Sequence, residues 1–148
     1  MKILLAMDES ECSQAAMRLV IREMRPEDSE VYVLHVAAPK WLVWDYDLGE
    51  LGQIEAAREE TLKRGQELLE RVKPLVAEAG FKVQTAMQEG DARFVIVDQA
   101  AAWNAELIVL GSHGRKGLGR LLLGSVAEHV ARHAHCSVLI VRLENRSE

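Results

Sequence analysis

Short runs of apolar residues alternate along this sequence with longer segments in which apolar residues recur every three or four positions. An uninterrupted apolar run is typical of a strand that is covered on both faces, whereas the three-to-four spacing is typical of a helix with one buried side. Predicted strands lie at residues 3–7, 31–36, 107–110 and 138–141. Predicted helices lie at residues 11–24, 53–79, 92–104 and 126–133.

A further segment, residues 81–88, alternates apolar and polar positions. This pattern predicts a strand with one wetter face, which belongs at the edge of a sheet. Strands that alternate with helices predict an α/β fold, in which a parallel sheet carries helices on both faces. The 148 residues suffice for one domain with its own core, so we expect a single domain over residues 1–148.

Polar residues and prolines predict where the helices begin and break. Ser10 or Asp8 is a natural cap for the first helix, Asp91 for the third and Ser125 for the last. Pro74 falls inside the longest helical repeat, where it is expected to kink or restart the helix, because proline lacks the N–H and crowds the preceding turn.

Composition and charge narrow the classes of partner. The chain is 49% hydrophobic and 28% charged, as in ordinary globular proteins, and its net charge of −5 argues against a general nucleic-acid or membrane-surface binder. No apolar run approaches the length that crosses a bilayer, and no signal peptide precedes the first strand. We therefore expect a cytoplasmic protein with neither nucleic acid nor membrane as partner.

The least regular stretch, residues 40–52, holds Trp41, Trp44 and Tyr46. Clustered aromatic side chains outside a core often mark a contact surface or a lid. The alternative is a loop that folds its tryptophans back onto its own domain. The sequence leaves both readings open.

A glycine-rich loop follows the predicted strand at residues 107–110 and leads into the last predicted helix. It begins Gly111-Ser112-His113-Gly114, ends at Gly124-Ser125, and carries Arg115, Lys116 and Arg120 without an acidic residue. Glycines between a strand and a helix let backbone N–H groups approach an anion, and the helix N-terminus adds partial positive charge. The loop therefore predicts nucleotide binding, although it contains neither of the two standard phosphate motifs, Gly-x-x-x-x-Gly-Lys-Ser/Thr and Gly-x-Gly-x-x-Gly.

The spacing of these glycines resembles that of a known family. Gly111, Gly114 and Gly124-Ser125 fit Gly-x2-Gly-x9-Gly-Ser/Thr, the signature of the ATP-binding universal stress proteins. The resemblance covers nearly the whole chain, from residues 1–10 to residues 138–142. It implies an open five-stranded parallel sheet in the order 3-2-1-4-5, Rossmann-like and similar to the adenine nucleotide alpha hydrolases.

The resemblance also implies roles for single residues. Asp8 would meet the ribose or adenine side, and Val36 would hold the adenine through its backbone. Gly111, Gly114, Gly124 and Ser125 would hold the phosphates, with Ser112 close by. The implied ligand is ATP or another adenine nucleotide, with Mg²⁺ carried on the phosphates. Apart from the resemblance, Asp8 can also be read as a helix cap.

Efficient catalysis is not predicted, because the loop has no Walker lysine, no arranged Ser-His-Asp set and no nearby acid to position a water. The main hypothesis is an ATP-binding, nucleotide-dependent protein of stress response. A weak ATPase, or phosphorylation on Ser112 or Ser125, is the alternative. A nucleotide-free interaction module is a further one, against which the retained glycines count.

The cysteines and the remaining histidines predict no separate site. Cys12 and Cys136 lie in no recognisable motif and are expected to remain structural thiols in a reducing cytosol. A zinc site can be drawn from His129, His133, His135 and Cys136, but the spacing matches no standard structural set.

The last predicted strand is apolar on both faces, yet it falls at an edge in the implied order. Its residues are Val138, Leu139, Ile140 and Val141. An exposed apolar edge invites pairing with another strand, so we expect a homodimer formed through this strand.

Overall fold

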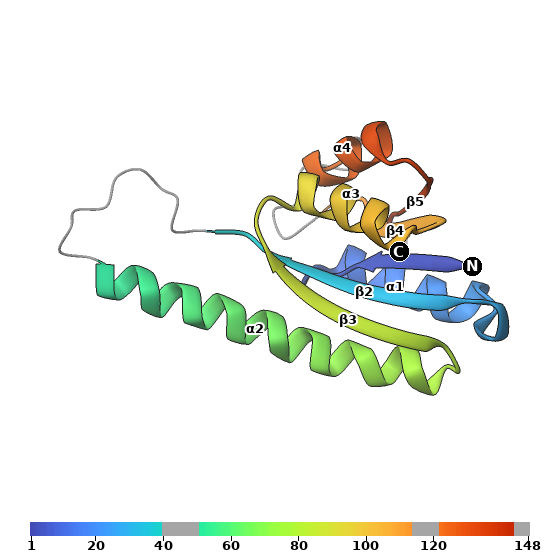
Figure 1. The fold of residues 1–148 in the computed structure, drawn as a ribbon, viewed down its shortest axis with the longest axis horizontal. Helices are drawn as coiled ribbons and strands as arrows, with labels where there is room; N and C mark the ends of the chain where they lie inside the picture. The colour runs from blue at the N-terminus through green and yellow to red at the C-terminus, as the bar shows by residue number, and fades with distance from the viewer. Residues whose placement is uncertain (40–50, 114–121, 144–148) are drawn as a thin grey trace, which may run out of the picture.

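The computed structural model describes residues 1–39, 51–113 and 122–143, which form a five-stranded sheet in the order β3-β2-β1-β4-β5 with every neighbouring pair parallel (Figure 1). The strands are β1 (Lys2–Ala6), β2 (Glu30–Ala37), β3 (Lys82–Glu89), β4 (Leu107–Gly111) and β5 (Ser137–Val141). The helices are α1 (Glu11–Glu23), α2 (Leu51–Glu78), α3 (Ala92–Trp103) and α4 (Ser125–His133), with a 3₁₀ turn η1 (Pro26–Asp28). The α/β fold, the strand order and the edge position of the alternating strand are confirmed. Trp41, Trp44, Tyr46, Gly114 and the three basic loop residues lie outside the described residues.

Side chains alternate between two cores on opposite faces of the sheet. Ile3 and Leu5 of β1, with Met7 directly after it, pack into the core shared with α1 and α2, whereas Leu4 and Ala6 of β1 pack into the core shared with α3 and α4. Figure 1 shows these two helix pairs on opposite sides of the strands. Because the central strands are covered on both faces, they read as continuous apolar runs in the sequence.

The first and third helices begin as predicted, and the last does not. The side chain of Ser10 accepts a hydrogen bond from the Ser13 N–H at the start of α1, and that of Asp91 accepts from the Arg93 N–H at the start of α3. The prediction that Ser125 caps α4 is wrong, because Gly124 holds the cap position and makes no side-chain cap bond. Ser125 is instead the first helical residue, since Gly124 O already accepts the first backbone bond of the helix from Glu128 N at 3.0 Å.

Helix α2 runs without interruption from Leu51 to Glu78 and includes Pro74. The alternative that Pro74 restarts the helix is therefore wrong. Figure 1 shows α2 lying along β3, with its N-terminal end projecting beyond the sheet. None of the helices in the described residues combines the length and apolar character needed to cross a membrane.

The sheet ends unevenly where the strand order reverses. The last pair of the β1 and β2 ladder is Ala6 with Leu34, yet β2 continues through Ala37. On the other side of β1, the carboxyl end of β4 lies next to β5, with Gly111 opposite Val141. The step between β1 and β2 leaves an open corner at this edge of the sheet.

Candidate functional site

A cavity of about 290 Å³ occupies this corner, over the carboxyl ends of β1, β2 and β4. In an open parallel sheet this is where ligands bind, at the point where the strand order reverses. Of the predicted site residues, Asp8, Val36 and Gly111 line the cavity. Ser112, Gly124 and Ser125 are not among the described residues that line it, although Val126 of α4 is.

Asp8 stabilises the turn that leads from β1 into α1 and still has one oxygen to offer. Its Oδ1 accepts hydrogen bonds from the backbone N–H of Ser10, at 2.8 Å, and from the hydroxyl of the same residue. The Ser13 hydroxyl donates to Asp8 O at 2.7 Å. Ser10 is thus the helix cap, and Asp8 orients it. Asp8 Oδ2 has no hydrogen-bond partner among the described residues and can accept from a ligand.

The backbone groups of Val36 face the cavity. Leu34 O accepts from Met7 N at 2.9 Å, and Ala37 O accepts from Gly90 N at 3.1 Å, so Leu34 faces β1 and Ala37 faces away from it. Because successive peptide groups of a strand alternate in direction, Val36 faces the side of β1. There β1 has already ended, and no backbone partner for Val36 occurs among the described residues.

His35 lines the same cavity and was missed as a site residue by sequence reasoning. Its Nδ1 donates to Met7 O at 2.8 Å, and since a carbonyl oxygen can only accept, Nδ1 carries the hydrogen. The one signal in the sequence is a histidine within an otherwise apolar run, which alone does not separate a core histidine from a functional one.

Two glycines of the signature are required by packing within the protein. A β-carbon on Gly111 would lie 2.6 Å from Cys12 Cβ and 2.8 Å from the Cys12 carbonyl carbon at the start of α1. A β-carbon on Gly124 would lie 2.9 Å from Ser112 O. These glycines therefore bring α1 and the start of α4 close to the end of β4, whatever the cavity holds.

Ser112 anchors the start of the loop, and His113 turns toward the cavity. Ser112 is buried, its N–H donates to Val141 O at 2.8 Å, and its carbonyl accepts from Gly124 N at 2.8 Å. His113 lines the cavity, and its Nδ1 lies 3.1 Å from Ser112 Oγ. His113 Nε2 is buried without a hydrogen-bond partner among the described residues. Such a buried polar atom has a free-energy cost that a bound polar group would relieve.

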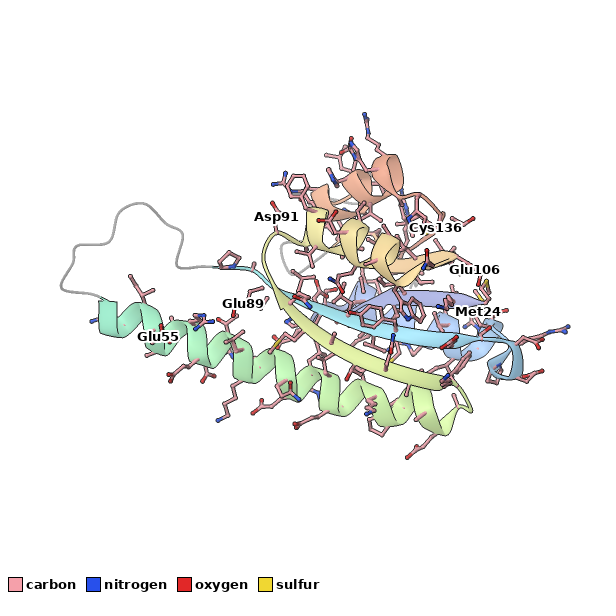
Figure 2. The ribbon with its side chains drawn as sticks, in the orientation of Figure 1. Met24, Glu55, Glu89, Asp91, Glu106 and Cys136 are labelled. Carbon is pink, nitrogen blue, oxygen red and sulfur yellow. The ribbon has the colours of Figure 1, made fainter. Side chains whose placement is uncertain are left out.

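Helix α2 contributes Thr61, Arg64 and Gly65 to the opposite wall. Close to this wall, Arg58 forms a two-bond ion pair with Glu89, with Nη2 to Oε1 at 2.7 Å and Nε to Oε2 at 3.1 Å. The hydrogen bond from Arg58 lowers the pKa of Glu89. Figure 2 shows Glu89 at the end of β3 beside α2. The pair joins α2 to the end of β3 beside the cavity, a contact that the sequence alone does not reveal because the partners are far apart in the chain.

The histidines of α4 lie apart from this cavity. The rings of His129 and His133 stack with centroids 4.1 Å apart, and His129 meets Phe94 edge-on at 4.8 Å. No group of three or more potential metal ligands occurs within the described ranges. Burial raises the pKa of the Cys136 thiol, which favours the unreactive protonated form.

Comparison with known proteins agrees with this architecture. The profile of the Universal stress protein family matches residues 1–142. Universal stress protein MJ0531 of Methanocaldococcus jannaschii is 40% identical over 141 residues, covering 95% of this chain and 81% of that protein. The solved structure of MJ0577 from the same organism has a TM-score of 0.84 at 28% identity, covering 97% of this chain and 96% of the other.

A universal stress protein family structure from Arabidopsis thaliana, solved with AMP bound, shares the fold at 20% identity with a TM-score of 0.72, covering 97% of this chain and 92% of the other. The family match spans nearly all of the sequence, and the sheet order, the glycine spacing and the cavity at the strand reversal accompany it. The chain belongs to the universal stress protein family.

Proposed function

We propose that this protein binds an adenine nucleotide in the cavity and acts as a nucleotide-dependent regulatory protein of stress response in the cytoplasm. The observation that carries the proposal is that the backbone N–H and carbonyl of Val36 have no hydrogen-bond partner among the described residues. Its N–H can donate and its carbonyl can accept, which matches a ring nitrogen beside the amino group of adenine. The structural neighbour solved with AMP supports the choice of ligand.

The remaining groups suit the sugar and the phosphates. Asp8 Oδ2, which has no partner in the described ranges, can accept a hydrogen bond from a ribose hydroxyl. His113 Nε2 offers a buried polar atom to a phosphate oxygen, and the start of α4 lies next to the same loop. The phosphates would be held by the loop that contains Gly111, Ser112, Gly114, Gly124 and Ser125. Where ATP is the ligand, Mg²⁺ would accompany its phosphates.

We propose binding without turnover as the primary role. Asp8 and Glu9 are the acidic side chains that line the cavity in the described residues, and Asp8 already accepts two hydrogen bonds from Ser10. We assign no residue to the activation of a water molecule. Release of inorganic phosphate from ATP, measured during the same titrations, tests this assignment.

Calorimetric titration with AMP and with Mg-ATP tests the proposal, using protein that has been unfolded and refolded to remove carried-over nucleotide. We expect binding at micromolar concentrations to the wild type. Ala92→Phe fills the cavity from the first residue of α3, so it should weaken binding at least tenfold. Ala131→Phe adds the same bulk on the exposed side of α4, outside the cavity lining, and should leave affinity unchanged.

Asp8→Asn tests whether the negative charge of Asp8, rather than the turn that it stabilises, contributes to binding of the ribose. Asparagine keeps an oxygen that can accept from the Ser10 N–H, but it loses the carboxylate. We expect weaker binding of AMP with the fold retained. Absence of binding by the refolded wild type to either nucleotide would contradict the proposal and favour a nucleotide-free interaction module.

A further inference from the structure

The carbonyl of Met7 has a different partner from the one that a regular parallel ladder would give it. In such a ladder, one residue bonds to two residues of the neighbouring strand that lie two positions apart. Its N–H donates to the carbonyl of the first, and its carbonyl accepts from the N–H of the second. Met7 makes the first bond, from its N to Leu34 O at 2.9 Å. The second would come from the N–H of Val36, but Met7 O is instead bonded to His35 Nδ1 at 2.8 Å.

We propose that His35 is a positioning residue that keeps the Val36 N–H available for a ligand. By occupying Met7 O, the imidazole prevents β2 from extending its ladder one step further along the chain. The N–H of Val36 then remains directed toward the cavity, with no acceptor in the part of the protein that the structure describes. This inference rests on the proposed function for the identity of the ligand, but the displaced ladder bond belongs to the free protein.

The imidazole is held in this orientation from the side of α2. A β-carbon on Gly65 would lie 2.6 Å from His35 Cδ2, 3.0 Å from its Nε2 and 2.6 Å from Met87 Sδ. The absent side chain in the middle of α2 therefore gives the ring its space against the helix. The arrangement explains why a glycine, which weakens a helix, lies at this buried position.

Hydrogen exchange of the Val36 amide in the free protein tests the displacement without any nucleotide. We expect Val36 to exchange much faster than the amides of Val33 and Leu34 in the same strand, because the described residues offer its N–H no acceptor. His35→Leu removes the donor and frees Met7 O, so the Val36 amide should become protected. His35→Asn places an amide N–H where Nδ1 stands and should restore rapid exchange.

Titration of the same variants with AMP gives the second measurement. His35→Leu should weaken binding about tenfold, the equivalent of one lost hydrogen bond, and His35→Asn should recover most of the affinity. His135→Leu, on the exposed loop before β5 and outside the cavity lining, is the matched histidine control and should bind as the wild type does.

The two measurements separate this inference from the proposed function. If Val36 of the wild type exchanges as slowly as Val33 and Leu34, the inference is wrong, even if His35→Leu fails to fold. It is also wrong if Val36 exchanges equally fast in wild type and His35→Leu. If the exchange pattern is as expected but AMP does not bind, the positioning of Val36 stands and the proposed ligand is wrong.

Discussion

At the scale of single residues, Gly111 and Gly124 show that a ligand signature can record internal packing. A side chain at either position would collide with backbone atoms of the segment that it faces. Both positions lie at the junctions that hold α1 and the start of α4 against the end of β4. Loss of nucleotide binding after substitution of either glycine would therefore not by itself identify a ligand contact.

We expect Gly111→Ala and Gly124→Ala to lower the free energy of unfolding by about 1–3 kcal/mol, the usual cost of forcing an extra carbon into a packed site. Urea denaturation measures this cost. Gly52→Ala is the matched control, because a β-carbon there meets nothing within 4 Å and the residue lies in α2. That variant should be neutral or slightly stabilising. Equal stabilities for all three variants would contradict the packing role.

Asp91 should make part of the stability of α3 dependent on pH. Its carboxylate accepts from the Arg93 N–H at 3.0 Å and pairs with the Arg93 guanidinium, whose hydrogen bonds lower the pKa of Asp91. A group with a lowered pKa in the folded state contributes stability above its unfolded pKa and loses it as pH falls through the folded value. Figure 2 shows Asp91 at the start of α3.

Asp91→Ala should lower the free energy of unfolding at neutral pH by about 1 kcal/mol, as loss of a helix cap does. Asp91→Asn keeps an oxygen that can accept from the Arg93 N–H, so it should cost less. Its difference from wild type should shrink as the pH is lowered below the ordinary range of an aspartate. Urea denaturation at several pH values gives these differences, and a gap that stays constant or widens in acid would contradict this account.

At the scale of elements, α2 illustrates that packing can outweigh the tendency of a proline to break a helix. Pro74 removes one N–H from the helix, yet the helix reaches Pro74 from Leu51 and continues beyond it to Glu78. Val72 and Val76, on either side of Pro74, are buried in the core shared with α1, whereas Pro74 itself is exposed. Burial of these neighbours can offset the local cost of the proline.

Pro74→Ala should therefore raise the free energy of unfolding by about 1–2 kcal/mol, because alanine restores the helical N–H while giving back some freedom to the unfolded chain. Thermal and urea unfolding measure the gain. Lys73→Ala, at the neighbouring exposed position, is the control and should change stability by less than about 0.5 kcal/mol. A loss of stability in Pro74→Ala would show that the proline is itself required for packing.

The elements also show how far sequence alone could predict this protein. Strands buried on both faces leave continuous apolar runs, so β1, β2, β4 and β5 were visible, and β3 alternates because one face is wetter. The resemblance added the strand order, and hence the corner between β1 and β2. Side-chain contacts across the fold were not visible, because no local pattern records that His35 meets Met7 O or that Arg58 reaches Glu89.

At the scale of the whole molecule, the outer edge of β5 is the place to test assembly. Within the described residues β5 pairs only with β4, and the side chains of Val138, Leu139 and Ile140 are partly exposed. We propose that a second copy pairs here and forms a homodimer.

Ile140→Lys should shift the protein toward monomer in sedimentation equilibrium, since it places a charge in the middle of the pairing strand. Ala131→Lys, on the exposed side of α4, adds the same charge away from this strand and should leave the association unchanged. A wild type that sediments as a monomer, or a dimer unaffected by Ile140→Lys, would argue against pairing through β5.

The cavity is lined by all four helices and by β1, β2 and β4, so it exists only while the whole fold is assembled. An occupant therefore binds the folded state alone and shifts the folding equilibrium toward it. At a free concentration one hundred times its dissociation constant, it would raise the free energy of unfolding by about 2.7 kcal/mol. Resistance of the protein to proteolysis would then rise and fall with the supply of the occupant. The amount of this protein in a cell would then depend on the earlier supply of the occupant, even after the concentration of the occupant had changed.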